Sequence, residues 1–203
     1  MSFEFLAPTA TDAVARSPME RQARAAGARF ELRGGWDVAV AYADEAAALG
    51  AVGFADCSHL RKYELDGESH GLELGRARVD GDATWLPLTA TRALVIGGDA
   101  PAGALDMTTA FAALRLAGPL ARETFARFTA IDLRPHVTKP GEWRPGSVAR
   151  TPGGVLCEAE DRYLMLFGAA FGQYMWTVVA DAARHLGGGP VGYEALVQET
   201  AGA

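Results

Sequence analysis

Four side chains that could bind a metal lie in the first half of the chain: Asp56, Cys57, His59 and His70. Thiolate, imidazole and carboxylate groups are ligands that zinc accepts, and a Cys-x-His spacing on a strand places both side chains on one face. A structural zinc site also requires a fixed tetrahedral set of ligands, and these residues do not supply one. We therefore expect no metal site.

Three common catalytic classes lack their signatures in this sequence. The chain contains no GxSxG elbow, no P-loop and no GxGxxG fingerprint. Its glycine run, Gly187 to Gly189, follows a predicted helix rather than opening one, so we interpret it as a linker and not as a phosphate cradle. His136 and His185 stand alone, which is typical of solvated or helix-capping histidines. Hydrolase, nucleoside-triphosphatase and dinucleotide-binding activities are thus disfavoured.

Length and charge restrict the choice further. The 203 residues are 49% hydrophobic, which suits one or at most two domains with a substantial core. Nineteen basic against 25 acidic residues give a formal charge of −6, so neither nucleic acid nor a membrane is an expected partner. Because the sequence has no secretory signal and no apolar run of roughly 20 residues, we expect a cytoplasmic protein. Cys57 and Cys157, far apart and outside any CxxC pattern, are expected to be reduced thiols.

Helices are predicted where capping residues precede an apolar stripe. Ser17, followed by Pro18 and by Glu20 three residues after the cap, predicts a short helix over residues 18–26 that ends at Gly27. Further helices are predicted over residues 44–49, 119–128, 172–185 and 193–200.

Strands are predicted where apolar segments lie between turn signals such as Asp66-Gly67 and Asp80-Gly81. They cover residues 54–57, 62–65, 72–79, 83–88, 91–96, 110–116, 143–150, 155–157 and 163–167. The order strand, helix, strand, strand, helix is that of a split βαβ unit. The sequence therefore predicts an α+β fold, a single module over residues 1–203 with two ferredoxin-like halves, about 1–104 and 105–203.

Several segments resemble a known family in the correct order. Residues 52–60 read VGFADCSHL, residues 106–119 read DMTTAFAALRLAGP, and residues 128–133 read FTAIDL. They resemble the opening strand, the strand-to-helix step and the T-x-x-D-L element of the glycine-cleavage T-protein (aminomethyltransferase) superfamily, which handles tetrahydrofolate. With CEAEDRY at residues 157–163 and VGYEAL at residues 191–196, the resemblance covers nearly the whole chain and implies the T-protein folate-binding fold.

Two departures from the family pattern bear on function. T-proteins carry a T-N-D element whose aspartate acts in one-carbon transfer, and residues 68–85 are too few to hold it. The sequence also ends at Ala203, without the family's C-terminal barrel. This layout is similar to the gamma subunit of heterotetrameric sarcosine oxidase. The resemblance thus implies flavoprotein subunits as partners and a fold without the C-terminal barrel. It assigns no catalytic residues, which stay unknown.

The resemblance implies that one acidic residue, Glu160, binds the pterin ring of the cofactor. Glu160 matches the glutamate that receives the pterin N–H donors, and a carboxylate can accept two parallel hydrogen bonds. The glycines around that position are replaced by Ala159 and Arg162, which would crowd the loop where the ligand approaches. Asp132 matches a structural position, where we expect it to cap a helix or form a turn.

Three functional hypotheses follow. The first is a non-catalytic gamma-type subunit of a sarcosine oxidase-like amine-demethylating complex, which binds no folate itself and has no activity alone. The second is a self-contained folate-dependent aminomethyl or methyl transferase or demethylase, with Glu160 holding tetrahydrofolate. The third is a family member that binds or transforms another small molecule, since folds are often reused. The sequence does not decide whether the isolated chain is an enzyme, or which folate or amine it would act on.

Overall fold

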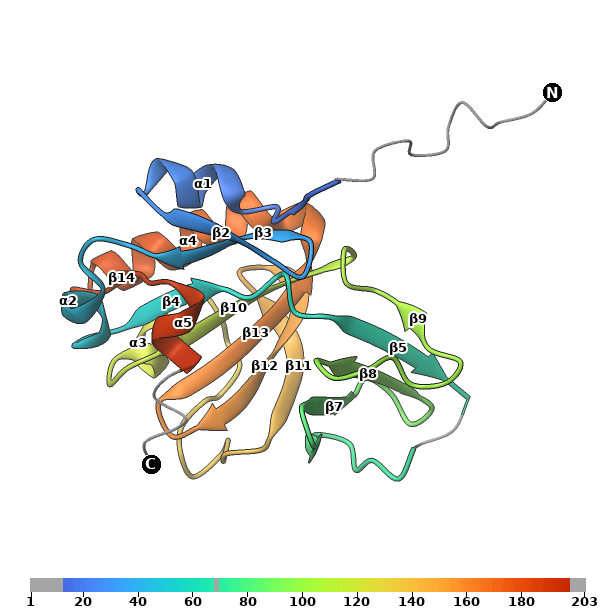
Figure 1. The fold of residues 1–203 in the computed structure, drawn as a ribbon. Helices are drawn as coiled ribbons and strands as arrows, with labels where there is room; N and C mark the ends of the chain where they lie inside the picture. Colours follow the sequence, from blue (N-terminus) through green and yellow to red (C-terminus); the bar gives the residue numbers. More distant parts are fainter. Residues whose placement is uncertain (1–12, 68–69, 198–203) are drawn as a thin grey trace.

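The computed structural model describes residues 13–67 and 70–197, which form three β-sheets and several helices (Figure 1). The helices are α1 (Glu20–Ala25), α2 (Glu45–Leu49), α3 (Ala121–Phe125), α4 (Gly172–Arg184) and α5 (Tyr193–Val197), with a 3-10 turn at Ala169–Phe171. The strands are β1 (Ala15–Arg16), β2 (Arg29–Arg33), β3 (Trp36–Ala41), β4 (Gly53–Asp56), β5 (Lys62–Asp66), β6 (Arg78–Asp80), β7 (Ala83–Pro87), β8 (Arg92–Ile96), β9 (Leu105–Asp106), β10 (Phe111–Ala117), β11 (Trp143–Val148), β12 (Thr151–Ala159), β13 (Arg162–Gly168) and β14 (Gly189–Pro190).

The sheets combine segments that are far apart in the sequence. The central sheet has the order β11-β12-β13-β10-β4-β14, the N-terminal sheet β1-β3-β2, and the lateral sheet β6-β7-β8-β5-β9. Neighbouring strands are antiparallel, except that β14 runs parallel to β4 and β1 parallel to β3. The Gly192 N–H, just after β14, donates to the Glu45 carboxylate at 2.6 Å. The segment around β14 thus pairs with β4 and contacts α2, which both lie in the first part of the chain.

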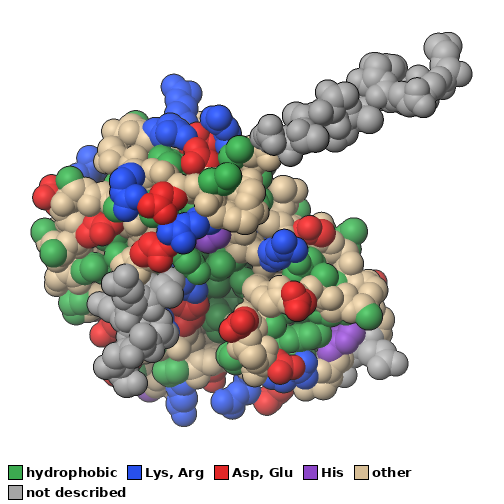
Figure 2. All heavy atoms as spheres, viewed as in Figure 1, with side chains coloured by type: hydrophobic (Ala, Val, Ile, Leu, Met, Phe, Trp, Pro, Cys, Tyr) green, Lys and Arg blue, Asp and Glu red, His purple; other side chains and the backbone are tan. Residues whose placement is uncertain are grey.

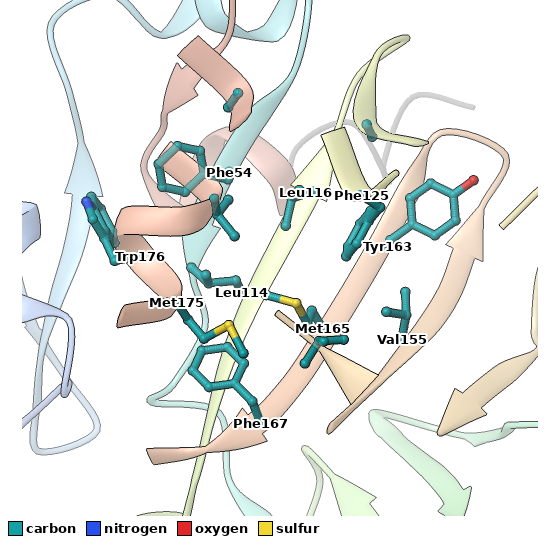
Figure 3. Close-up of a cluster of buried hydrophobic side chains, with 14 of the residues drawn as sticks. Phe54, Leu114, Leu116, Phe125, Val155, Tyr163, Met165, Phe167, Met175 and Trp176 are labelled. Carbon is teal, nitrogen blue, oxygen red and sulfur yellow. The ribbon is translucent and has the colours of Figure 1, made fainter. Parts of the chain in front are cut away.

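One face of the central sheet packs against α4. Leu114, Met165 and Phe167 point to this face, where Met175 and Trp176 of α4 meet them (Figure 3). All five side chains are at most 5% exposed, and burying each contributes roughly 1.5 to 3 kcal/mol. The alternation of side chains along a strand therefore gives this face most of the core.

The other face of the central sheet packs against the lateral sheet. Residues that alternate with the first set, among them Leu164 and Leu166, meet Leu86 and Leu94 here. Because both faces are covered, β10 and β13 read as nearly continuous apolar runs rather than as alternating ones. A cavity remains between the central and lateral sheets, next to α5, and this cavity is the candidate site.

The helix predicted at residues 18–26 is confirmed, although its cap forms differently. The Ser17 hydroxyl accepts the Met19 N–H at 3.0 Å, and Gly27 takes the left-handed φ of +85° after the helix. Glu20 pairs with Arg16 and Arg24 rather than with the Ser17 backbone. The helices predicted at 44–49, 119–128 and 172–185 correspond to α2, α3 and α4. Residues 198–200 of the last predicted helix lie outside the described residues.

The strands differ from the prediction in several places. Residues 29–33 and 36–41 form the hairpin β2–β3, which was not predicted. The strand predicted at 72–79 is reduced to β6, because Gly71 and Gly75 take positive φ and interrupt the extended backbone. The strand predicted at 143–150 ends at Val148, since residues 149 and 150 form a turn with φ of 45° and 64°.

The fold class is confirmed at a coarse level: the described chain mixes helices with predominantly antiparallel sheets. The central sheet takes β4 from the first part of the chain and β10 to β13 from the second. The division into two ferredoxin-like halves, and the description of residues 1–203 as one module, stay predictions.

Candidate functional site

A cavity of about 490 Å³ lies where the central sheet, the lateral sheet and α5 meet. Its walls combine charged and apolar side chains from all three parts. The lining residues are Ala77, Val79, Asp82, Thr84, Arg115, Gly141, Leu156, Cys157, Glu158, Arg162, Tyr193 and Leu196. Figure 2 shows the molecule hollowed between α5 and the lateral sheet, with hydrophobic side chains in the hollow. Its volume is in the range of small-molecule sites.

Three charged side chains reach this cavity from neighbouring strands. Arg115 lies in the middle of β10, between two leucines that point into the opposite, helix-covered core. Glu158 lies at a β-bulge in β12, where the register with β13 shifts between Cys157 and Ala159. A bulge re-aims the side chain of its extra residue, and this one directs Glu158 toward Arg115. Arg162, at the start of β13, completes the group.

These residues form a compact ionic network. The Arg115 guanidinium donates two hydrogen bonds of 2.8 Å, one to each oxygen of the Glu158 carboxylate. Arg162 Nε lies 3.4 Å from the same carboxylate. The three side chains are only 14 to 20% exposed, so solvent screens their charges less than it would at the surface. Two guanidiniums thus share one carboxylate.

The pKa of Arg115 reflects this position. Burial lowers the pKa of the guanidinium, but the negative charges of Cys57 as a thiolate and of the Glu158 carboxylate outweigh burial and raise this pKa overall. Arg115 is therefore a fixed cation at the cavity wall, as arginine generally is in proteins.

A second cavity of about 650 Å³ adjoins the first and is lined by Arg33, Trp36, His59 and Arg61, among others. The His59 ring, which lines this second cavity, stands edge-on to Tyr193, which lines the first, with ring centroids 4.6 Å apart. Burial lowers the pKa of His59 to about 4, so the imidazole is neutral at pH 7.

The residues first considered as metal ligands have structural roles instead. The Asp56 carboxylate accepts the Ser58 N–H at 2.9 Å, while the fully buried Lys62 donates to the carbonyl oxygens of Ser58 and Leu60 at 2.8 and 2.7 Å. Burial lowers the pKa of Lys62 to about 8. The His70 ring lies apart from these residues, beside Trp85 of the lateral sheet, with ring centroids 6.0 Å apart. The hydrogen bonds of Asp56 and Lys62 hold the turn after β4 in place.

Both cysteines are free thiols. Cys57 packs toward the lateral sheet, whereas Cys157 packs in the core on the helix side. Burial raises the pKa of each thiol to about 11, so both are protonated at neutral pH. The expectation of reduced cysteines agrees with this placement on opposite faces of the sheet.

Glu160, the predicted pterin ligand, is exposed in the turn between β12 and β13 and does not line either cavity. Its cofactor role stays a prediction. The carboxylate at the cavity is Glu158, which sequence reasoning missed because a bulge is not visible in the sequence. Asp132 accepts the Arg134 N–H at 3.1 Å and so has the turn role expected for it.

Comparison with known proteins gives likenesses in structure only. No protein-family model matches the chain, and no curated protein matches its sequence. The heterotetrameric sarcosine oxidase from Corynebacterium sp. U-96, solved in complex with pyrrole 2-carboxylate, contains a similar chain: the TM-score is 0.68 at 18% identity, over 87% of this chain and 98% of that one. Aminomethyltransferase T of the Bartonella henselae glycine cleavage system gives 0.69 at 14% identity, over 90% of this chain but 60% of that one. Within the described residues, no helix combines the length and apolarity needed to cross a membrane.

Proposed function

The chain has a T-protein-like fold, and from this premise we propose that it is a non-catalytic, gamma-type subunit of a sarcosine oxidase-like complex that demethylates amines in tetrahydrofolate-linked one-carbon metabolism. The observation that carries this proposal is the extent of the two likenesses. The chain covers 98% of a sarcosine oxidase chain but only 60% of aminomethyltransferase T. A chain of the first kind works beside other subunits in a heterotetramer.

The state of the cavity supports a role without catalysis. Both oxygens of Glu158 are engaged by Arg115, and Arg162 approaches the same carboxylate. The two acceptor sites that face Arg115 are therefore closed to the parallel N–H donors of a pterin. In this proposal the partners are flavoprotein subunits, which bind the amine substrate and any tetrahydrofolate.

An exposed aromatic pair is the best candidate contact with such a partner. Phe171 and Tyr174, at the start of α4, are 41% and 47% exposed, whereas Phe167 and Met175 nearby are completely buried. Large aromatic side chains are enriched at protein interfaces, where they carry much of the binding energy. Phe171 and Tyr174 can therefore be changed without opening the core.

The test is copurification of the full chain from cells that produce it. A flavin-containing partner that oxidises sarcosine, and that is lost from Phe171→Ser but retained by the matched surface change Thr177→Ala, is the expected result. If the chain purifies alone under gentle conditions and no amine oxidase activity accompanies it, the subunit proposal is wrong.

A self-contained folate-dependent transferase is the alternative, supported by the likeness to aminomethyltransferase T. Here Glu160 would hold tetrahydrofolate. Calorimetry with tetrahydrofolate and folinic acid separates the two proposals. Binding by the isolated chain that Glu160→Gln weakens by about 1 to 3 kcal/mol, the cost of an unpaired buried donor, would favour the transferase.

A further inference from the structure

We propose that the cavity between the central and lateral sheets binds a small organic anion, a carboxylate on an apolar body, through Arg162 and Arg115. This inference goes beyond the subunit role and does not depend on it, because it concerns the isolated chain. It also differs from pterin binding, in which the protein supplies the carboxylate and the ligand supplies the N–H donors.

The first argument is an excess of positive charge inside the cavity. Arg115 and Arg162 both face Glu158, so the pair of guanidiniums carries one charge that the interior does not balance. Asp82 also lines the cavity, but it is exposed in the turn between β6 and β7 and makes no ion pair with either arginine among the described residues. A cation beside a partly enclosed cavity is stabilised by an anion.

The second argument is an unused donor. The Nε–H group of Arg162 is buried, and no described residue accepts a hydrogen bond from it; Glu158, at 3.4 Å, lacks the required geometry. Buried donors in proteins are nearly always satisfied, so an orphan donor at a cavity wall indicates an acceptor that comes from outside the chain. A carboxylate is the natural partner of an arginine fork.

The third argument concerns the apolar walls. Leu156, Leu196 and Val79 line the same cavity, together with the ring of Tyr193. Val79 is 73% exposed and would lose contact with water if a ligand filled the space. The walls therefore favour an anion with an apolar or aromatic body over a small inorganic ion such as phosphate.

The sequence position of Arg162 makes this feature particular to this chain. The resemblance described above places a glycine at this position, and a glycine would leave an open loop beside the cavity. Here the side chain enters the site and pairs with the bulge residue Glu158. Arg162 thus adds a second cation to a wall that already holds the Arg115–Glu158 pair.

The experiment measures binding of benzoate to the full chain by calorimetry or ligand-observed NMR. Benzamide, benzylamine and inorganic phosphate serve as neutral, cationic and non-aromatic comparisons. We expect benzoate to bind more tightly than all three, and Arg162→Gln to weaken it by about tenfold or more, as for a lost charge-assisted contact. Arg127→Gln, at an exposed arginine that does not line the cavity, is the matched control and should change nothing.

A second variant keeps the test decisive if Arg162→Gln fails to fold. Glu158→Gln releases both guanidiniums from their carboxylate and should strengthen benzoate binding severalfold. The proposal is overturned if benzoate does not bind, if benzylamine binds equally well, or if Arg162→Gln behaves like Arg127→Gln. These outcomes are independent of copurification, so failure here leaves the subunit proposal intact, and the reverse also holds.

Discussion

Replacing Glu158 by glutamine should destabilise the protein although it removes only one charge. Arg115 is 14% exposed and directs two hydrogen bonds of 2.8 Å at the carboxylate. Removing one partner of a buried ion pair generally costs about 3 to 5 kcal/mol, because the other charge is left uncompensated. Glutamine still offers one oxygen, and the pair is not fully enclosed, so we expect a loss of about 2 to 3 kcal/mol. For a chain of this size that corresponds to about 4 to 12 °C in melting temperature.

The assay is urea or thermal unfolding of the wild type and of matched variants. Glu160→Gln changes the same chemical group two residues away, in an exposed turn, and should alter the free energy of unfolding by less than about 0.5 kcal/mol. Arg115→Met combined with Glu158→Gln should cost less than the sum of the single changes, since the double variant leaves only Arg162 without its carboxylate instead of both arginines. Equal effects of Glu158→Gln and Glu160→Gln, or strictly additive single changes, would refute the reasoning.

Three further outcomes are expected. The pKa of His59 is lowered by burial to about 4, so between pH 6.5 and 4 the unfolded state binds more protons than the folded state. As the pH is lowered through this range, the free energy of unfolding should decrease by up to about 3 kcal/mol. Urea titrations at several pH values should show this dependence of stability on pH, and His59→Gln should reduce it; an unchanged dependence would contradict the assignment. The pKa of Lys62 is lowered by burial to about 8, so stability should rise from about pH 8 to 10.5; Lys62→Met should remove that rise, even if it lowers stability at pH 7 through the lost backbone hydrogen bonds. A Cβ at Gly154 would lie 2.2 Å from the Trp143 ring, so Gly154→Ala should cost at least about 2 kcal/mol in thermal unfolding, whereas Gly189→Ala, with its nearest neighbour at 3.8 Å, should cost far less; equal losses would show that the ring moves aside freely.

The elements that the sequence predicted well are those with local signals. α4 combines an apolar stripe with a glycine-rich end, and β10 and β13 are apolar runs between turn signals. The β2–β3 hairpin was missed although Phe30 and Leu32 alternate with charged residues, because β2 is short and rich in arginine and glutamate. Which strands pair was not predictable, since the register depends on contacts between distant segments.

The site was predicted less well than the fold. Arg115 could have been singled out, because a cation in the middle of an apolar strand is unusual and normally needs a buried partner. Glu158 could not, since the bulge that directs it toward Arg115 is a property of strand pairing and not of local sequence. The resemblance pointed to Glu160 in the same hairpin, close in sequence but on the exposed turn.

The joining of the last described strand to the first part of the chain has a consequence for biosynthesis. β14 completes the edge of the central sheet beside β4, and the Gly192 N–H reaches Glu45 across 147 residues of sequence. While the chain is still being synthesised, the edge of β4 that later binds β14 has no partner until the segment around Gly189 leaves the ribosome. Unpaired strand edges are prone to aggregate. Yield in recombinant expression should therefore depend on how quickly the segment around Gly189 is synthesised, and on chaperones that shield β4 until then.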